Sequence, residues 1–383
     1  MMKIAVIGSG RLGICFALLL DRAGHQVIAS DIRTNYVAGL QARRIKTAEP
    51  GVADMLATCN IDFTTDTRRA INESEIIYVM VATPSLADGS YDVSAVERVV
   101  EDIRESDFDL SGKILVIGCT TNPGDCQRLQ DRLRARGVSL LYNPEFIAQG
   151  SILRDLEHAD MVLIGGEDHT VMDHYKLVYD AIQPTVTPNV HTMSLTAAEL
   201  VKIATNCFLT TKISYANMMG EVLLRSGLES DVDRALAAIG ADTRVGHRYM
   251  RYGLGYGGPC LPRDNRAFAH YAETVGLDFP LGHIVDQFNL GHTDFVAKYW
   301  INNNKQQQPF YIENLSYKRG TDIYEESQQL RLAEILMAAG LVVYTQDCEL
   351  MPAAVRKDLT ARWGDRLRFV DGPIPDECIR IPV

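Results

Sequence analysis

Near its amino end the chain reads Lys3-Ile4-Ala5-Val6-Ile7-Gly8-Ser9-Gly10-Arg11-Leu12-Gly13. A short apolar run without polar alternation is typical of a strand that is buried on both faces of a parallel sheet. The glycines after it permit a tight turn, the close approach of a pyrophosphate and the close packing of helix on strand. A helix that begins here offers free N–H groups to phosphates. The stretch predicts a nucleotide-binding βα unit.

The alternation of apolar strands and helices continues through the first half of the chain. With helices such as 12–22 and 93–105 between them, we expect strands at Lys3–Ile7, Gln26–Ser30, Glu75–Val81, Lys113–Ile117, Ser139–Tyr142 and Met161–Ile164. Repeated units of this kind imply a doubly wound parallel sheet with right-handed crossovers. Residues 1–194 are therefore predicted to form a Rossmann-type, doubly wound α/β domain.

The pattern changes near residue 194. Thr196-Ala197-Ala198-Glu199 has the form of a capping box, and a long amphipathic helix is expected from there to about Leu224. Residues 195–300 are predicted as a central helical region, and the polar stretch Asn302–Pro309 as a linker. A second βαβ-like pattern predicts a short C-terminal α/β domain over 301–383, with too few residues at its end for a further unit.

Composition narrows the class of partner. The 383 residues carry a formal net charge of −11, which argues against a nucleic acid or an anionic membrane as the main partner. The eight cysteines form no Cys-x-x-Cys pair and the histidines show no metal-ligand spacing, so we expect reduced core thiols and no metal. No signal peptide or membrane helix is apparent in the pattern. A cytoplasmic location is therefore expected.

Asp31 lies at the end of the second predicted strand, where a carboxylate accepts hydrogen bonds from the adenosine ribose. Strand, glycines, helix, strand and acid together predict a nicotinamide dinucleotide site. Asp31 favours NAD over NADP because it repels a 2′-phosphate, although Arg33 softens that preference. S-adenosylmethionine enzymes also use glycine-rich loops, but the full spacing suits them less well.

Polar groups follow three further predicted strands, at Thr83-Pro84, at Thr120 and at Glu145. The carboxyl ends of parallel strands form the ligand-binding edge of such sheets.

On the long helix, Lys202 and Asn206 are one turn apart and share a face. An exposed helix face explains a single lysine equally well. Together, however, the two side chains can donate to an oxygen that gains negative charge.

The stretch Gly255-Tyr256-Gly257-Gly258-Pro259-Cys260-Leu261-Pro262-Arg263-Asp264 places one thiol in a stiff, glycine-rich loop. Glycines allow close backbone approach, and prolines restrict the chain and remove N–H donors. A surface turn with a chance cysteine is the alternative. A loop that presents Cys260 at a fixed point to a small molecule would need this stiffness.

The sequence resembles the nucleotide-sugar 6-dehydrogenase family, which includes the UDP-glucose and GDP-mannose dehydrogenases. The similar segments follow the family's order along nearly the whole chain: Gly8–Gly13, Thr83-Pro84, Thr120, Asn143–Phe146, Glu199–Asn206, Asp242–Gly246, Gly255–Asp264 and, more weakly, Lys318–Ser327. The cysteine loop is the most specific of them. Its form is closer to glucose-type and mannose-type members than to those acting on N-acetylated sugars.

The resemblance implies a four-electron oxidation, in which a sugar CH2OH becomes an aldehyde and then a carboxylate while two NAD molecules are reduced in turn. Cys260 would form a thiohemiacetal and then a thioester, which water hydrolyses. The other implied catalytic residues are Asp264 and Lys202 for proton handling, Lys202 and Asn206 for the oxyanion, and Thr120 and Glu145 for water and hydrolysis.

The resemblance also implies binding residues and an assembly. Those for NAD are Gly8, Gly10, Arg11, Leu12, Gly13, Asp31, Thr83, Pro84, Thr120 and Arg263. Those for the nucleotide sugar are Glu145, Phe146, Lys202, Asn206, Arg244, Tyr249, Gly257 and Lys318. The family is at least dimeric, and a homodimer through the long helix after residue 194 is expected.

UDP-glucose is the favoured substrate, with GDP-mannose or another nucleotide-linked sugar as the alternative. A non-catalytic binding protein and a two-electron hydroxy-acid dehydrogenase also remain open, but the complete reactive set favours the four-electron enzyme.

Four residues depart from the family's usual pattern. Arg263 and Tyr36 stand where lysine is usual, Gln149 replaces a common glutamate, and Glu325 occupies the position of an arginine. Because the C-terminal region expected to recognise the base is short, the base and the sugar stay open.

Overall fold

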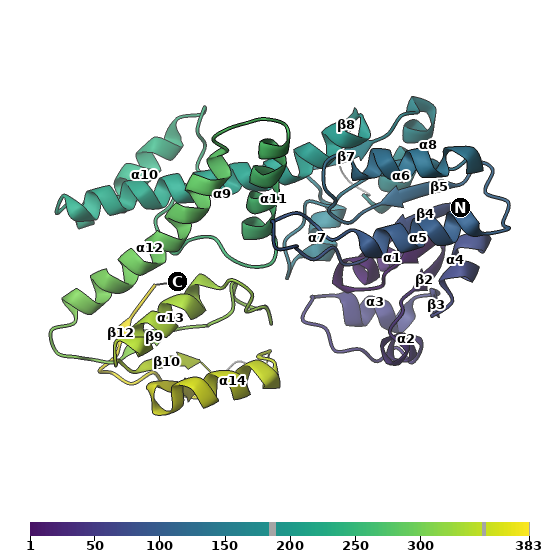
Figure 1. Cartoon of the computed structure of the whole chain (residues 1–383). Helices are drawn as coiled ribbons and strands as arrows, with labels where there is room; N and C mark the ends of the chain where they lie inside the picture. The colour runs from purple at the N-terminus through teal and green to yellow at the C-terminus, as the bar shows by residue number, and fades with distance from the viewer. Residues whose placement is uncertain (184–188, 347–349, 383) are drawn as a thin grey trace. The chain divides into compact units, whose positions relative to one another are not determined.

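The computed structural model describes residues 1–183, 189–346 and 350–382, so Cys348 lies outside the described residues. The chain forms two compact units, Met1–Ile203 and Ala204–Val383. The boundary falls within the long helix α9 (Leu195–Arg225), which begins and ends close to its predicted bounds. Figure 1 shows the two units, the first running from purple to teal and the second from teal through green to yellow.

The first unit is built on an eight-stranded sheet in the order β3-β2-β1-β4-β5-β6-β7-β8. Its strands are β1 (Lys3–Ile7), β2 (Gln26–Ser30), β3 (Asp62–Thr64), β4 (Ile76–Val79), β5 (Ile114–Ile117), β6 (Ser139–Tyr142), β7 (Met161–Gly165) and β8 (Asn189–Met193). The doubly wound, Rossmann-type fold is thus confirmed. One detail of the parallel sheet was wrong, because β7 pairs antiparallel with β6.

Two strands of this sheet were not predicted. β3 and β8 are its outermost strands; in β3 only Phe63 is buried, and all residues of β8 are exposed or partly buried, so neither strand forms an apolar run. An edge strand has a neighbour on one side only and needs fewer apolar side chains than a central strand. The central strands β1, β4 and β5 are buried almost throughout and had a clear signal.

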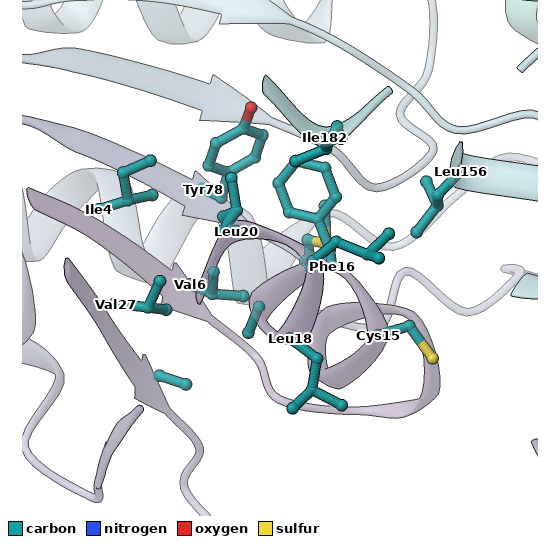
Figure 2. Packing of buried hydrophobic residues seen from close by; sticks show 14 of the residues in the cluster. Ile4, Val6, Cys15, Phe16, Leu18, Leu20, Val27, Tyr78, Leu156 and Ile182 are labelled. Atoms are coloured by element: carbon teal, nitrogen blue, oxygen red, sulfur yellow. The ribbon is translucent and has the colours of Figure 1, made fainter. Parts of the chain in front are cut away.

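Helix α1 carries much of the core of the first unit. All residues from Gly13 to Leu20 are buried, so α1 is enclosed on every side. Figure 2 shows Phe16 among side chains of the sheet and of the helices that cover it, and the centre of its ring lies 4.5 Å from that of Tyr78.

The helices of the unit are α1 (Arg11–Arg22), α2 (Thr34–Gln41), α3 (Val52–Thr58), α4 (Thr67–Glu73), α5 (Ser94–Glu105), α6 (Asp125–Leu133), α7 (Ile152–Glu157) and α8 (His169–Ile182), with the 3-10 turn η1 (Arg134–Arg136).

The second unit combines helices with a small sheet. Its helices are the rest of α9, α10 (Val232–Ala241), α11 (Leu261–Thr274), α12 (Leu281–Asn303), α13 (Gln328–Ala338) and α14 (Ala353–Trp363), with the 3-10 turns η2 (Glu229–Asp231) and η3 (Gly364–Arg366). Because α12 continues to Asn303, the polar stretch predicted as a linker begins inside a helix.

The small sheet is parallel, in the order β11-β10-β9-β12. Its strands are β9 (Phe310–Ile312), β10 (Val343–Gln346), β11 (Leu367–Val370) and β12 (Ile379–Arg380). The smaller C-terminal α/β fold is confirmed. The last residues were expected to be too few for a further unit; they form the two-residue strand β12, which pairs with β9 at one edge of the sheet.

Across residues 1–183, 189–346 and 350–382, no helix has both the length and the apolar character needed to cross a membrane. Within the same ranges, no three side chains of metal-ligating type gather in a way that could hold an ion.

Candidate active site

The glycine loop after β1 is shaped by its contacts on one side and is open on the other. A Cβ on Gly13 would lie 2.0 Å from the carbonyl oxygen of Gly8, and one on Gly8 would lie 2.6 Å from that of Met80. A Cβ on Gly10 would meet nothing within 4 Å. The N-cap residue of α1 is Gly10, which has no side chain to accept from the N–H groups of the first turn. The loop therefore fits a pyrophosphate.

Asp31 follows β2, as predicted, and is only 7% exposed. Both its carboxylate oxygens are engaged by Arg33, through Nε at 2.8 Å and Nη2 at 2.7 Å, and the Arg33 backbone N–H donates at 3.0 Å. Burial alone would raise the pKa of Asp31, but the hydrogen bonds from Arg33 outweigh burial and lower it. Asp31 is therefore ionised and largely neutralised by Arg33.

The other residues predicted for NAD in the first unit follow β4 and β5 or lie on α1. Thr83 is buried after β4 and Pro84 beside it is exposed, while Thr120 is half-buried after β5. Leu12 is half-buried on α1. Arg11 donates to Gln149 at 3.0 Å, so the departure at 149 provides an uncharged partner for Arg11.

Glu145, Phe146 and Lys202 are brought together in the first unit. The Lys202 ammonium donates to the backbone oxygen of Glu145 at 2.7 Å and lies 4.7 Å from the centre of the Phe146 ring. The Glu145 carboxyl accepts a hydrogen bond from the Tyr179 hydroxyl. Burial raises the pKa of Glu145 to about 7, against the opposing effects of Tyr179 and Lys202. A carboxyl group with this pKa can exchange a proton near neutral pH.

Tyr179 was missed by the sequence analysis. It lies on α8, one turn after Tyr175, on a helix face whose apolar pattern indicates only packing in the core. Tyr175 donates to the side-chain oxygen of Asn143 at 2.6 Å and shares a hydrogen bond with Tyr78. Asn143 in turn donates to the backbone of Leu163 at 2.9 Å. These buried hydrogen bonds hold the segment that carries Glu145.

The raised pKa of Glu145 makes the stability of the protein depend on pH. Between about pH 4.5 and 7 the folded state keeps a proton that the unfolded chain has released, so this group's effect is to lower stability as pH rises. In Glu145→Gln, the decrease in the free energy of unfolding from pH 5 to pH 8 should be smaller than in the wild type by about 2 kcal/mol. Urea titrations at both pH values measure this, and equal slopes in the two proteins would contradict it.

Glu199 does not cap the start of its own helix, as the capping box predicted. Its fully buried carboxylate accepts from the Thr121 hydroxyl at 2.7 Å, and from the backbone N–H groups of Gly124 at 2.7 Å and Cys126 at 2.9 Å. Since α9 begins at Leu195, Thr196 lies inside the helix, and the predicted capping box was wrong. Glu199 instead caps α6, whose own N-cap residue is a glycine without a side chain.

In the second unit, Asn206, Arg263 and Asp264 meet. Asp264 is 1% exposed; it accepts from the Asn206 amide at 2.6 Å and pairs with Arg263 at 3.4 Å. This contact explains an asparagine in the middle of a helix. Cys260 is the N-cap residue of α11 and is exposed, and its carbonyl accepts from the Asp264 N–H at 2.8 Å. The thiol is therefore accessible at a fixed helix start.

The glycines of the cysteine loop permit three close approaches within the second unit. A Cβ added at Gly255 would lie 2.1 Å from the Asn289 side chain. One at Gly257 would lie 2.4 Å from the Glu326 backbone oxygen, and one at Gly258 would lie 2.4 Å from the Tyr317 ring. Gly258 also has φ +80°. Packing alone thus requires glycine at 257, and the predicted contact of Gly257 with the sugar stays a prediction.

The remaining predicted substrate residues are spread over the second unit. Arg244 is largely exposed and forks onto Asp242, and Lys318 is exposed. Tyr249 has φ +67°, a strained conformation for a non-glycine residue that is often found at functional sites. Tyr249 lines a pocket of about 530 Å³, a size typical of ligand sites, whose other walls include Arg251, Tyr252, Tyr299 and Trp300.

Comparisons with known proteins agree with this arrangement. Residues 2–183 match the NAD binding domain of the UDP-glucose/GDP-mannose dehydrogenase family, and residues 196–290 match its central domain. YtcA of Bacillus subtilis (strain 168), provisionally named a UDP-glucose 6-dehydrogenase, is 32% identical over 372 residues, or 94% of this chain and 85% of YtcA.

Two solved structures are also similar. A UDP-glucose dehydrogenase from the hyperthermophilic archaeon Pyrobaculum islandicum has a TM-score of 0.83 at 28% identity, covering 97% of this chain and 87% of that one. A UDP-D-ManNAc dehydrogenase from Pyrococcus horikoshii shares the fold, with a TM-score of 0.76 at 24% identity, over 90% and 83% of the two chains.

Proposed function

The chain belongs to the UDP-glucose/GDP-mannose dehydrogenase family and has its NAD binding domain, and from this premise we propose that it is a nucleotide-sugar 6-dehydrogenase. The reaction is the four-electron oxidation of a sugar CH2OH to a carboxylate, with UDP-glucose as the favoured substrate. The observation that carries the proposal is the exposed thiol of Cys260, fixed at the start of α11 four residues before the buried Asp264. A two-electron hydroxy-acid dehydrogenase has no use for this thiol.

In the proposed first oxidation, the C6 hydroxyl loses its proton while a hydride leaves C6, which gives the aldehyde. NAD supplies the hydride acceptor. Asp264 and Lys202 handle the proton, directly or through water. Asp264 is suited to orient such a group because Asn206 and Arg263 hold its carboxylate in place.

In the proposed second oxidation, the Cys260 thiolate adds to the aldehyde carbon and forms a thiohemiacetal. The ammonium of Lys202 and the amide of Asn206 stabilise the oxyanion. Loss of a second hydride to a second NAD leaves a thioester. Water that is oriented by Thr120 and deprotonated by Glu145 attacks the thioester and releases the carboxylate and the thiol. A pKa of about 7 suits Glu145 to this step.

The nucleotide sugar is proposed to contact Phe146, Arg244, Tyr249, Gly257 and Lys318. The aromatic pocket beside Tyr249 supports a site for the flat nucleotide base. The name of the Pyrobaculum islandicum homologue favours UDP-glucose. Because a UDP-D-ManNAc dehydrogenase has a similar fold, other sugars are also to be tested as substrates. A cytoplasmic homodimer through α9 completes the proposal; exposed apolar side chains such as Phe208 and Val222 on that helix support it.

The yield of NADH per sugar tests the proposal. Purified protein is incubated with excess NAD and a limiting amount of each of several UDP- and GDP-linked hexoses. Two NADH per sugar and a uronate product are expected with at least one UDP-hexose, UDP-glucose first. One NADH per sugar with a carbonyl product would contradict the four-electron reaction. Tight nucleotide-sugar binding without turnover would instead favour a non-catalytic binding protein.

A further inference from the structure

The loop between β2 and α2 (Figure 1) carries an ion pair between Arg33 and Asp31 that changes the electrostatics of the adenosine ribose site. In an NAD-specific site, an acidic residue here accepts both ribose hydroxyls and repels a 2′-phosphate. In this protein the guanidinium of Arg33 covers both oxygens of Asp31, at 2.8 and 2.7 Å. The negative charge that should reject a phosphate is therefore compensated at contact distance.

Arg33 is held in place and still accessible. Its guanidinium lies 4.2 Å from the centre of the Tyr36 ring, and its side chain is 55% exposed, whereas that of Asp31 is 7% exposed. The fork onto Asp31 uses Nε and Nη2. An arginine has five N–H donors in one plane, so Nη1 and the second hydrogen of Nη2 can bind a phosphate in the same orientation.

Tyr36 contributes to this arrangement. It stands on α2 at the position where the family often has a lysine, and its half-buried ring gives the guanidinium a flat surface to stack on. Stacking and the carboxylate fork together fix the plane of Arg33 before any ligand binds. A preorganised guanidinium loses little conformational freedom when it binds a phosphate.

We propose that Arg33, stacked on Tyr36 and paired with Asp31, makes the adenosine ribose site accept a 2′-phosphate, so that this protein binds NADP(H) as well as NAD(H). Arg33 is then the residue that determines cofactor specificity. The proposal rests on the dinucleotide site of the proposed enzyme and not on its sugar chemistry.

Calorimetric titration of the full-length protein with NADH and NADPH, in the absence of sugar, tests this. In the wild type, the Kd for NADPH should lie within about tenfold of the Kd for NADH. In Arg33→Ala, the ratio of these Kd values should rise at least tenfold, because Asp31 regains an uncompensated charge. Arg33→Lys keeps the charge without the fork and should fall between the two. Arg104→Ala, which removes an exposed, ion-paired arginine of α5, is the control and should leave the ratio unchanged.

A wild-type preference for NADH above about a hundredfold would overturn the proposal, as would a ratio that Arg33→Ala leaves unchanged. Because only dinucleotide binding is measured, these outcomes are independent of the sugar. Failure to oxidise any nucleotide sugar, with both dinucleotides bound, would instead count against the proposed function alone.

Discussion

Cys260→Ser is expected to abolish uronate formation while dinucleotide binding is retained. A serine hydroxyl fits the same space but is rarely ionised near neutral pH, so it neither adds readily to the aldehyde nor forms the thioester. Loss of a covalent nucleophile should reduce carboxylate production by about a thousandfold or more, equivalent to about 4 kcal/mol in the barrier. Product mass spectrometry and NADH yield measure this effect.

The appropriate control is Cys378→Ser, which alters a half-buried thiol of the same unit on another segment of the chain, just before β12. It should keep wild-type activity. Calorimetric titration with NADH should give the same Kd for Cys260→Ser as for the wild type, which would show that the loss lies in the chemistry. A fully active Cys260→Ser protein would rule out the covalent mechanism.

Glu199→Ala should cost about 3–5 kcal/mol of stability, the largest structural effect that we expect. The substitution leaves a hydroxyl and two backbone N–H groups without their acceptor, at Thr121, Gly124 and Cys126. Each buried donor without a partner costs about 1–3 kcal/mol. A cavity adds to the loss because Glu199 is fully buried.

Urea unfolding measures this effect. Both tryptophans, Trp300 and Trp363, lie in the second unit, so their fluorescence reports on that unit, whereas circular dichroism also follows the first. Glu199→Gln keeps one acceptor oxygen and should lose less stability than Glu199→Ala. A loss below about 1 kcal/mol in Glu199→Ala would show that water or a local shift replaces the carboxylate.

The central strands and α1 could be predicted from the sequence to within a residue or two. β1, β2 and β6 begin and end at their predicted residues, because a strand buried on both faces must be apolar along its length. The same reasoning failed for β3, β8 and β12, which lie at sheet edges. The antiparallel direction of β7 could not be predicted either, because an apolar run is compatible with both parallel and antiparallel pairing.

For the site, local sequence identified most of the candidate residues but not their partners. Asp31, Glu145 and Cys260 were found because their residue types follow strands or glycine-rich turns. Tyr179 was missed and Glu199 was given the wrong partner, because the atoms they contact lie on other elements far along the chain.

The sequence by itself determined the family, the two α/β folds and the set of groups available for chemistry, because these depend on local apolar periodicity and on residue type. The tertiary structure alone decided which groups are paired and how they are charged. Burial and a Tyr179 hydrogen bond place the pKa of Glu145 near neutrality, and the fork from Arg33 neutralises Asp31. Burial and charge compensation are properties of neighbours in space, which only folding brings together.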